Sequence, residues 1–270
     1  MALYTRYISL YTGSGQLDKG FERGIIELGL PEPKPICYVE REFQAASLLV
    51  DKIQAGKMGK APVWTDSSTF DSKPFIGKVD AIIGGFPCTP FSVAGNQKGE
   101  EDERWLWEDI KRLAIQVRPK FLFLENVPGI ISGRGLHRVL SGFAEIGYNA
   151  EWVSIQAKHV GASHKRERLF ILAYSDCKRL ERKNNSKARR STSGPSRSFP
   201  PGRNIKQWEH IIKKRPDLAP TEIKSEVCGM ADGMGRRLDS ISRIGQLRLL
   251  GNGVVPQQAT AALKILFNRL

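Results

Sequence analysis

Cys88 lies between two prolines in the stretch GGFPCTPFSVAG (84–95), directly after an apolar run. Proline restricts the backbone and glycine permits sharp bends, so we expect this thiol at a rigid turn and not inside a helix or strand. Four interpretations are open at this point: a packed thiol, half of a disulfide, a metal ligand or a nucleophile. Nucleophilic attack requires thiolate character or an acceptor that becomes more reactive when attacked.

The other cysteines favour a free thiol at position 88. Cys37, Cys177 and Cys228 are far from Cys88 and from one another, and no CxxC pair occurs. This spacing argues against a zinc site, and against a disulfide scaffold in a chain of 270 residues. We therefore expect no metal, and a reducing cytoplasmic environment in which the thiols stay free.

Two polar motifs further along the chain contain candidate partners for this thiol. The motif ENV (125–127) ends an apolar stretch and places Glu125 at the end of an expected strand. The motif HKRER (164–168) places Arg166 and Arg168 at the start of a later strand. A thiol, a carboxyl and a guanidinium could therefore converge.

A second set of residues has the pattern of a site for an adenosine-containing ligand. The first expected strand leads into the stretch YTGSGQLDKG (11–20), in which a G-x-G turn precedes a helix. Glycines there let the backbone approach a ligand, and the helix N-terminus supplies free N–H groups. Glu40 ends the second strand, where an acid can accept hydrogen bonds from ribose hydroxyls, and Asp66 follows the third, where it could receive an adenine amino group. For either acid, the alternative is an N-cap of the next helix.

These residues require a scaffold that brings strand ends together, and the hydrophobic pattern predicts one. Short apolar runs alternate with amphipathic ones, which predicts strands over 6–11, 35–40, 61–64, 79–85, 120–127, 148–157 and 168–174, and helices over 17–28, 42–53, 104–117 and 135–146. A last helix is expected within 247–270, with an apolar face of Ala259, Ala262, Leu263, Leu266 and Phe267. This alternation indicates an open, mainly parallel α/β sheet with helices on both faces, which binds ligands beyond the carboxyl ends of its strands. Every polar motif above lies at such an end, apart from Arg166 and Arg168.

The charge of the chain is concentrated in one segment. The formal net charge is +14, and residues 178–215 alone contain 13 Lys/Arg against two Glu. A basic balance favours a polyanionic partner such as nucleic acid, while the alternative for 182–204 is a solvated, partly disordered linker. No run of 18 apolar residues occurs, and the first residues lack a signal-peptide pattern, so we expect neither a membrane span nor secretion.

The motifs GGFPCTPFSVAG, ENVPG, GASHKRERLF and LGNGVVPQQA, in that order, resemble the motif set of the DNA cytosine-C5 methyltransferases. SLYTGSGQL is similar to that family's cofactor loop, and the resemblance covers roughly 1–175 and 240–270. It implies a Rossmann-like class I methyltransferase sheet with helices on both faces, plus a small basic target-recognition region. The domains implied are 1–175 for catalysis and cofactor binding, 176–240 as a short target-recognition region, and 241–270 as a motif and helix that return to the catalytic domain.

The resemblance also implies a mechanism in which S-adenosylmethionine methylates C5 of a cytosine flipped out of duplex DNA. Cys88 would attack C6 and Glu125 would hold or protonate N3. Arg168 and Arg166 would steady the base and brace the carboxyl, while Asn126 would orient the loop. The implied cofactor contacts are Tyr11, Gly13, Gly15, Leu17, Glu40, Asp66, Pro87 and Asn252, and the expected nucleic-acid contacts are Ser92, Arg189 and Arg190. The sequence departs from the family pattern where Ser9 replaces an acid, Gln16 a glycine and His164 a glutamine.

Three other functions fit parts of the sequence. One branch of the family performs the same chemistry on transfer RNA, although PCTPFSVAG resembles the DNA-acting form. A catalytically silent DNA-binding protein would not need Cys88, Glu125 and both arginines, and a nicotinamide-dependent oxidoreductase would explain the glycine turn alone. For the preferred function we expect double-stranded DNA as the partner, a monomer, and either a cognate restriction nuclease or none. The target sequence is not readable, because recognition loops follow no transferable code.

Overall fold

The computed structural model describes residues 4–87, 106–132, 135–175 and 253–270. The expected contacts Cys88, Ser92, Arg189, Arg190 and Asn252 lie outside the described residues. In chain order the elements are β1 (Tyr4–Leu10), α1 (Gln16–Glu27), β2 (Glu32–Val39), α2 (Phe43–Gln54), β3 (Val63–Trp64), the 3-10 turn η1 (Lys73–Phe75), β4 (Ala81–Gly85), α3 (Trp107–Val117), β5 (Phe121–Asn126), α4 (Gly129–Ser132), α5 (Gly135–Glu145), β6 (Tyr148–Gln156), the 3-10 turn η4 (Ala157–Val160), β7 (Glu167–Ser175) and α8 (Pro256–Phe267).

The described strands form one seven-stranded sheet in the order β3-β2-β1-β4-β5-β7-β6. Neighbouring strands from β3 to β5 are parallel, whereas β7 is antiparallel to both β5 and β6. This reversal follows from the short connection through η4, because a parallel crossover needs roughly a dozen or more residues. The expected open, mainly parallel sheet is confirmed, and each predicted strand and helix is present with its ends shifted by a few residues.

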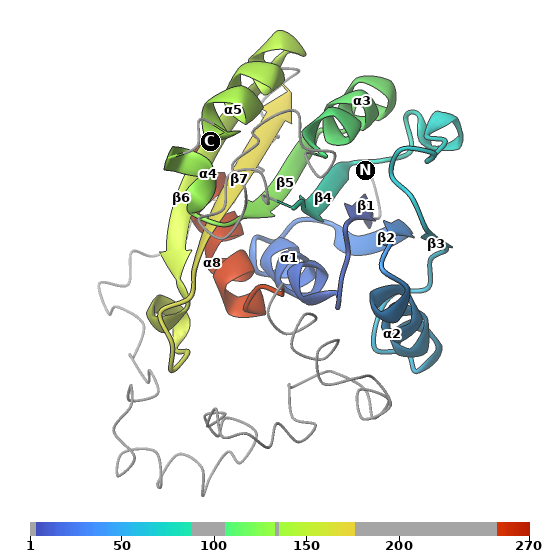
Figure 1. Cartoon of the computed structure of the whole chain (residues 1–270), viewed down its shortest axis with the longest axis horizontal. Coiled ribbons are helices and arrows are strands. Elements are labelled where there is room, and N and C mark those ends of the chain that lie inside the picture. The colour runs from blue at the N-terminus through green and yellow to red at the C-terminus, as the bar shows by residue number, and fades with distance from the viewer. Residues whose placement is uncertain (1–3, 88–105, 133–134, 176–252) are drawn as a thin grey trace, which may run out of the picture.

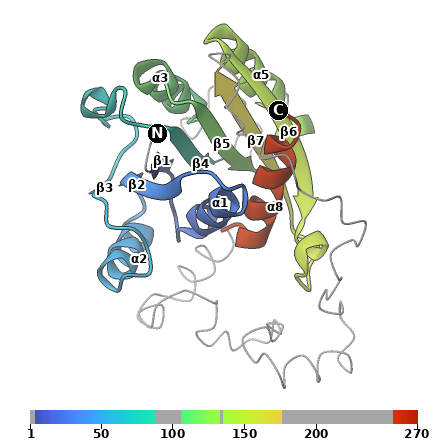
Figure 2. The same ribbon diagram turned by 180° about the vertical axis from the view of Figure 1, so that it is seen from behind.

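Helices cover both faces of this sheet, which explains why its central strands carry apolar side chains on both faces. In β4, Ile82 packs into a cluster with α3 and α5, while Ala81 and Ile83 face a second cluster with α1 and α8. Figure 1 shows α3 and α5 on one side of the sheet and α1 and α8 on the other, and Figure 2 shows the same layers from behind. Burial on both faces is typical of parallel strands in α/β proteins.

The first and last helices pack against each other at small residues. A Cβ at Gly20 would meet the Pro256 carbonyl and lie 2.6 Å from Cβ of Ala259, so only glycine allows this approach. Thr260 donates its hydroxyl to the Gly20 carbonyl at 2.9 Å. The predicted apolar face of α8 is buried in full, and α8 lies beside α1 in both views.

None of the helices in the described ranges has the length and apolar character needed to cross a membrane.

Candidate active site

The antiparallel direction of β7 brings the arginine motif to the edge where β4 and β5 end. Glu125 is the fifth of six residues in β5 and pairs with Gly85, the last residue of β4. Arg168 lies at the start of β7, and its Nε is 2.7 Å from Oε1 of Glu125. The guanidinium therefore lies against the carboxyl, where its positive charge favours the ionised form. Two predicted catalytic residues, Glu125 and Arg168, are thus in contact, although Glu125 lies at the end of its strand and Arg168 at the start of its own.

The Glu125 carboxyl is almost fully buried, with 8% of the residue exposed. Burial raises its pKa from near 4.5 to about 7, and the charges of Arg168 and Arg166 oppose this rise. A carboxyl with this pKa keeps its proton close to neutral pH. In that state it is able to donate a hydrogen bond or a proton to a basic ring nitrogen.

Gly85 lets the Glu125 side chain lie across the end of β4. A Cβ on Gly85 would be 2.9 Å from Oε2 of Glu125, closer than real Cβ atoms approach. Because β4 leads directly to Phe86, Pro87 and Cys88, the carboxyl lies next to the strand that carries the predicted nucleophile.

We expect Gly85→Ala to lower kcat by about 10²-fold, because a displacement of a reacting group by roughly 1 Å is enough for such a loss. The clash is with the end of a movable side chain, so the variant should fold and bind cofactor as the parent does. Single-turnover methylation and thermal unfolding measure the two effects separately. An unchanged kcat in a folded variant would place the reacting carboxyl elsewhere.

Asn126 ties β5 to the segment that leads to Cys88. Its Nδ2 donates to the Phe86 carbonyl at 3.1 Å, and its Oδ1 accepts from the backbone N–H of Val127 at 2.8 Å. The side chain is buried, so both of its polar ends have partners. This geometry suits the loop-orienting role expected for Asn126. Pro87 is exposed at the last described position before Cys88.

The last motif of the chain meets the arginine motif. Arg166 donates from Nη2 to the carbonyl of Gly253, the residue that follows Asn252 in the sequence, at 2.6 Å. Gln258, fully buried on α8, donates from Nε2 to the carbonyls of Ile155 at 2.8 Å and Arg166 at 2.9 Å. The sequence analysis missed Gln258, although its spacing of four residues from Ala262 places an amide on the apolar face of α8.

Four of the predicted cofactor residues gather at the turn after β1. Tyr11, Gly13 and Gly15 all have positive φ, of 53°, 56° and 74°. The Gly13 N–H donates to Oε2 of Glu40 at 2.6 Å, and Oε1 of Glu40 accepts from the backbone N–H of Glu42 at 2.8 Å. Glu40 therefore holds the turn from the end of β2, and each carboxylate oxygen retains a second lone pair for a ligand.

The remaining two described cofactor candidates differ in their surroundings. Leu17 is buried among the apolar residues between α1 and α8. Asp66 lies in the loop after β3, and its Oδ1 accepts from the backbone N–H of Ser68 at 2.9 Å and from its hydroxyl at 2.8 Å. Asp66 thus caps a turn rather than a helix, with no partner to Oδ2 in the described part of the chain.

Behind the glycine turn lies a buried polar group that the sequence analysis did not identify. Lys52 of α2 is 1% exposed and donates from Nζ to the Ser14 carbonyl at 2.6 Å. Asp18 is equally buried, and its oxygens have no well-aligned donor. Burial raises the Asp18 pKa to about 7, while the nearby Ser9 hydroxyl partly lowers it. Ser9 stands where the family pattern has an acid, and in this chain the neighbouring Asp18 of α1 provides a carboxyl next to that position.

Lys52 carried a signal in the sequence, because it continues the apolar spacing of Ala45, Leu48 and Leu49 on α2. A lysine on such a face has to find a polar partner inside the protein.

Within the described ranges, no group of three or more His, Cys, Asp or Glu side chains could hold a metal ion.

The sheet order and the single reversed strand define the Rossmann-like fold of class I methyltransferases. Two solved structures share it: DNMT2 of Spodoptera frugiperda, in a mutant form, with a TM-score of 0.51 and 18% identity over 67% of this chain and 53% of that chain, and the Dnmt2 methyltransferase of S. pombe, with a TM-score of 0.50 and 22% identity over 65% and 52%. At these identities the likeness concerns the fold alone.

The family model of the C-5 cytosine-specific DNA methylases matches residues 5–229, and the chain belongs to this family. The Type II methyltransferase M.CviJI of Paramecium bursaria Chlorella virus IL3A is 34% identical over 169 residues, which is 62% of this chain and 42% of that protein. The Type II methyltransferase M.BanI of Aneurinibacillus aneurinilyticus is 29% identical over 171 residues, or 62% and 38%. The chain spans less than half the length of these two relatives.

Proposed function

We propose that the chain transfers a methyl group from S-adenosylmethionine to C5 of a flipped cytosine in duplex DNA, through a covalent bond between Cys88 and C6. The observation that carries this proposal is the buried Glu125–Arg168 pair at the strand edge. The pair lies against Gly85, three residues before Cys88, in a chain of the cytosine-C5 methylase family.

The turn after β1 fits an adenosine-containing cofactor. A Cβ on Gly13 would meet only the Tyr11 carbonyl, at 3.9 Å, so space above the turn is open to a ligand. Glu40 lies beside this space and can accept hydrogen bonds from ribose hydroxyls. Asp66 keeps one oxygen for an amino group, and Leu17, Pro87 and Asn252 complete the proposed set. When bound there, S-adenosylmethionine supplies an electrophilic methyl group on a positively charged sulfur.

The residues of the chain would then divide the reaction as follows. The Cys88 thiolate forms a bond to C6 as Glu125 gives its proton to N3, and the electron pair of the 5,6 double bond moves to C5. After C5 is methylated, loss of the C5 proton to a base lets the Sγ–C6 bond break. This step restores the double bond and the thiolate, and the N3 proton returns to Glu125. Arg168 holds the carboxyl, and Asn126 holds the segment before Cys88.

We propose the same division of the chain as the sequence suggested. Residues 1–175 and 241–270 would form the catalytic and cofactor-binding unit, and 176–240 the target-recognition region. The packing of α8 beside α1 on one face of the sheet supports the first part. Duplex DNA would contact Ser92, Arg189 and Arg190. The protein would act as a cytoplasmic monomer, with or without a cognate restriction nuclease.

Bisulfite sequencing of DNA from cells that express the protein tests the activity and reads the target at once. Protected cytosines should recur in one short sequence context, and should be absent when the Cys88→Ser variant is expressed. Purified protein with methyl-labelled S-adenosylmethionine should label duplex DNA and not transfer RNA. Label in transfer RNA alone would favour the RNA alternative, and no transfer at all the silent DNA-binding protein.

We expect Arg189→Ala with Arg190→Ala to weaken duplex binding similarly on all sequences and to flatten the slope of log affinity against log salt by roughly 1–2 units. The reason is that each phosphate neutralised by a cation contributes about −0.9 to this slope. DNA titrations at several salt concentrations measure it. An unchanged slope would mean that the basic residues 178–215 form a solvated spacer.

A further inference from the structure

The loop of residues 65–72 has little support from the sheet. It follows β3, which is only two residues long, and precedes η1. A loop without ladder hydrogen bonds needs other partners for its carbonyls if it is to hold one conformation. Asp66, the proposed contact for the adenine amino group, is part of this loop.

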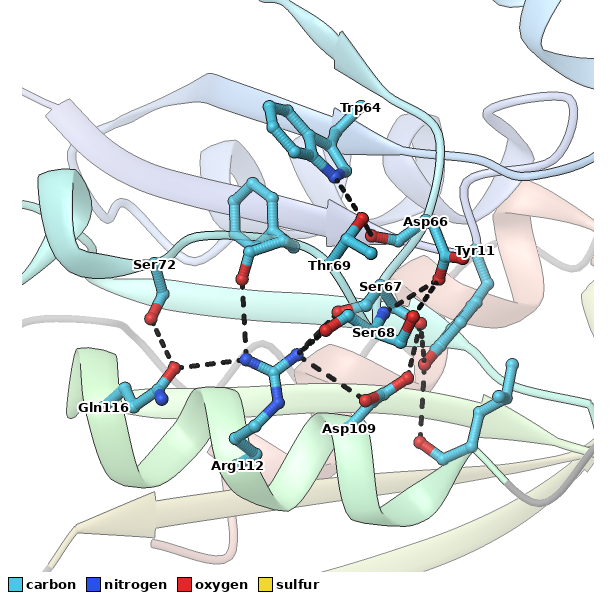
Figure 3. A network of polar contacts seen from close by, with 12 residues as sticks. Tyr11, Trp64, Asp66, Ser67, Ser68, Thr69, Ser72, Asp109, Arg112 and Gln116 are labelled. Atoms are coloured by element: carbon cyan, nitrogen blue, oxygen red, sulfur yellow. Dashed lines mark hydrogen bonds and ion pairs between the residues drawn. The ribbon is translucent and has the colours of Figure 1, made fainter. Parts of the chain in front are cut away.

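Arg112 of α3 supplies these partners. Its Nη2 donates to the Ser67 carbonyl at 2.6 Å and lies 3.5 Å from that of Ser68, and its Nη1 lies 3.5 Å from the Phe70 carbonyl. Figure 3 shows the guanidinium between the loop and the helix. The contact to Ser67 is the strong one, because a charged donor at this distance makes a stronger hydrogen bond than a neutral one.

Asp109, one turn earlier on α3, connects the loop to the cofactor turn. The Ser67 hydroxyl donates to Oδ2 of Asp109 at 2.7 Å, and the same hydroxyl accepts from the Tyr11 hydroxyl at 3.2 Å. Oδ1 of Asp109 lies 3.5 Å from the Arg112 guanidinium. Tyr11 has a positive φ of 53°, which is uncommon for a bulky residue, and this chain of hydrogen bonds anchors its side chain.

Gln116, one turn later, holds the far end of the loop. Its Oε1 accepts from the Ser72 hydroxyl at 2.6 Å and from Nη1 of Arg112 at 3.3 Å. Asp109, Arg112 and Gln116 thus form one polar face of α3 that is directed at the loop, as Figure 3 shows.

We propose that Arg112 and Asp109 are positioning residues for the cofactor: they fix the loop of residues 65–72 and the Tyr11 side chain so that Asp66 is held where the adenine ring binds. The proposal rests on the proposed function. Neither residue touches the reacting atoms, so the effect should fall on cofactor affinity and not on the chemical step.

The test is the dissociation constant of S-adenosylmethionine, measured by calorimetry on the full chain for the parent and for Arg112→Met. We expect affinity to fall by roughly tenfold or more, since hydrogen bonds from a charged donor are lost. At saturating cofactor, kcat should stay within about twofold. Arg112→Lys should recover only part of the affinity, because an ammonium cannot bridge several carbonyls as a guanidinium does.

Arg118 provides a matched control on the same helix. It follows the last residue of α3 and donates from Nη1 to the Ile146 carbonyl at 2.8 Å, away from the loop of residues 65–72. Arg118→Met should leave the cofactor dissociation constant unchanged. Equal losses of affinity in the Arg112 and Arg118 variants would reduce the effect to general destabilisation and overturn the proposal.

The outcomes separate this proposal from the proposed function. No binding of S-adenosylmethionine by the parent chain would overturn the proposed function, and the positioning role with it. Binding by the parent and equal binding by a folded Arg112→Met would overturn the positioning role alone. If Arg112→Met does not fold, Arg112→Lys decides instead, because it keeps the positive charge but cannot bridge the carbonyls of Ser67, Ser68 and Phe70 as the guanidinium does. Unchanged affinity in a folded Arg112→Lys would then refute the role.

Discussion

Cys88→Ser is expected to abolish methyl transfer and to leave duplex binding largely intact. A serine hydroxyl is a far poorer nucleophile toward C6 near neutral pH than a cysteine thiolate. The substitution replaces the Sγ atom by an oxygen and changes the shape of the side chain little, so the contacts with DNA should be retained. Methyl transfer from labelled cofactor and DNA titration of the same preparation measure the two properties. Turnover near that of the parent would exclude the covalent mechanism.

DNA with 5-fluorocytosine at the target gives an independent test of the same bond. After addition of Cys88 to C6 and methylation of C5, fluorine cannot leave as the proton does, so the Sγ–C6 bond has no route to break. With saturating cofactor, the parent chain should form an adduct that survives denaturing electrophoresis, and Cys88→Ser should form none. An absent adduct with the parent would count against the scheme even if methylation is observed.

Glu125→Gln is the second change with a large expected effect. It should lower kcat by about 10²–10⁴-fold, the usual contribution of a positioned proton donor. The dissociation constant of S-adenosylmethionine should not change, because Glu125 lies at the ends of β4 and β5 and the proposed cofactor turn follows β1. Loss of cofactor binding with unchanged turnover would place Glu125 in the other pocket.

The pKa of Glu125 also predicts the pH dependence of the parent chain. Since the carboxyl keeps its proton up to about pH 7, the rate should fall as pH rises through this value. An unperturbed cysteine thiol has a pKa of about 8.5, so the fraction of reactive thiolate falls as pH is lowered. The profile of kcat/KM against pH should therefore be bell-shaped. A rate that rises steadily from pH 6 to 9 would show that protonated Glu125 is not needed.

The same shift has a consequence for stability. Burial raises the pKa of Glu125 in the folded chain from near 4.5 to about 7, so between these values the folded state binds a proton that the unfolded state has lost. Stability therefore decreases as pH rises through this window. Glu125→Gln lacks this decrease, and its melting temperature relative to the parent should be higher at pH 8 than at pH 5.

The sequence predicted the elements well and their directions less well. The hydrophobic pattern located the strand at 168–174, but a strand's period does not reveal which way it runs. The short connection after residue 157 did carry that information, since it leaves room only for an antiparallel return. With that reversal, Arg168 no longer stands apart from the other motifs, and its contact with Glu125 follows.

The supporting residues were harder to foresee for a physical reason. Asp109 and Arg112 look like the solvated side of an amphipathic helix, and their partners in the loop of residues 65–72 are more than thirty-five positions away in the sequence. Local spacing cannot encode a contact of this kind. Lys52 and Gln258 differ, because each interrupts an apolar stripe, and a buried polar side chain must be satisfied from within.

The packing of α1 against α8 also has a consequence for folding during synthesis. Gly20 and Thr260, joined by one hydrogen bond, are 240 positions apart. At a ribosomal rate of roughly 5–20 residues per second, Phe21 and Ile25 leave the ribosome many seconds before the helix that covers them exists. Over that interval the apolar face of α1 stays exposed on the nascent chain. A chaperone that binds exposed aromatic and aliphatic side chains would cover this face until α8 is made.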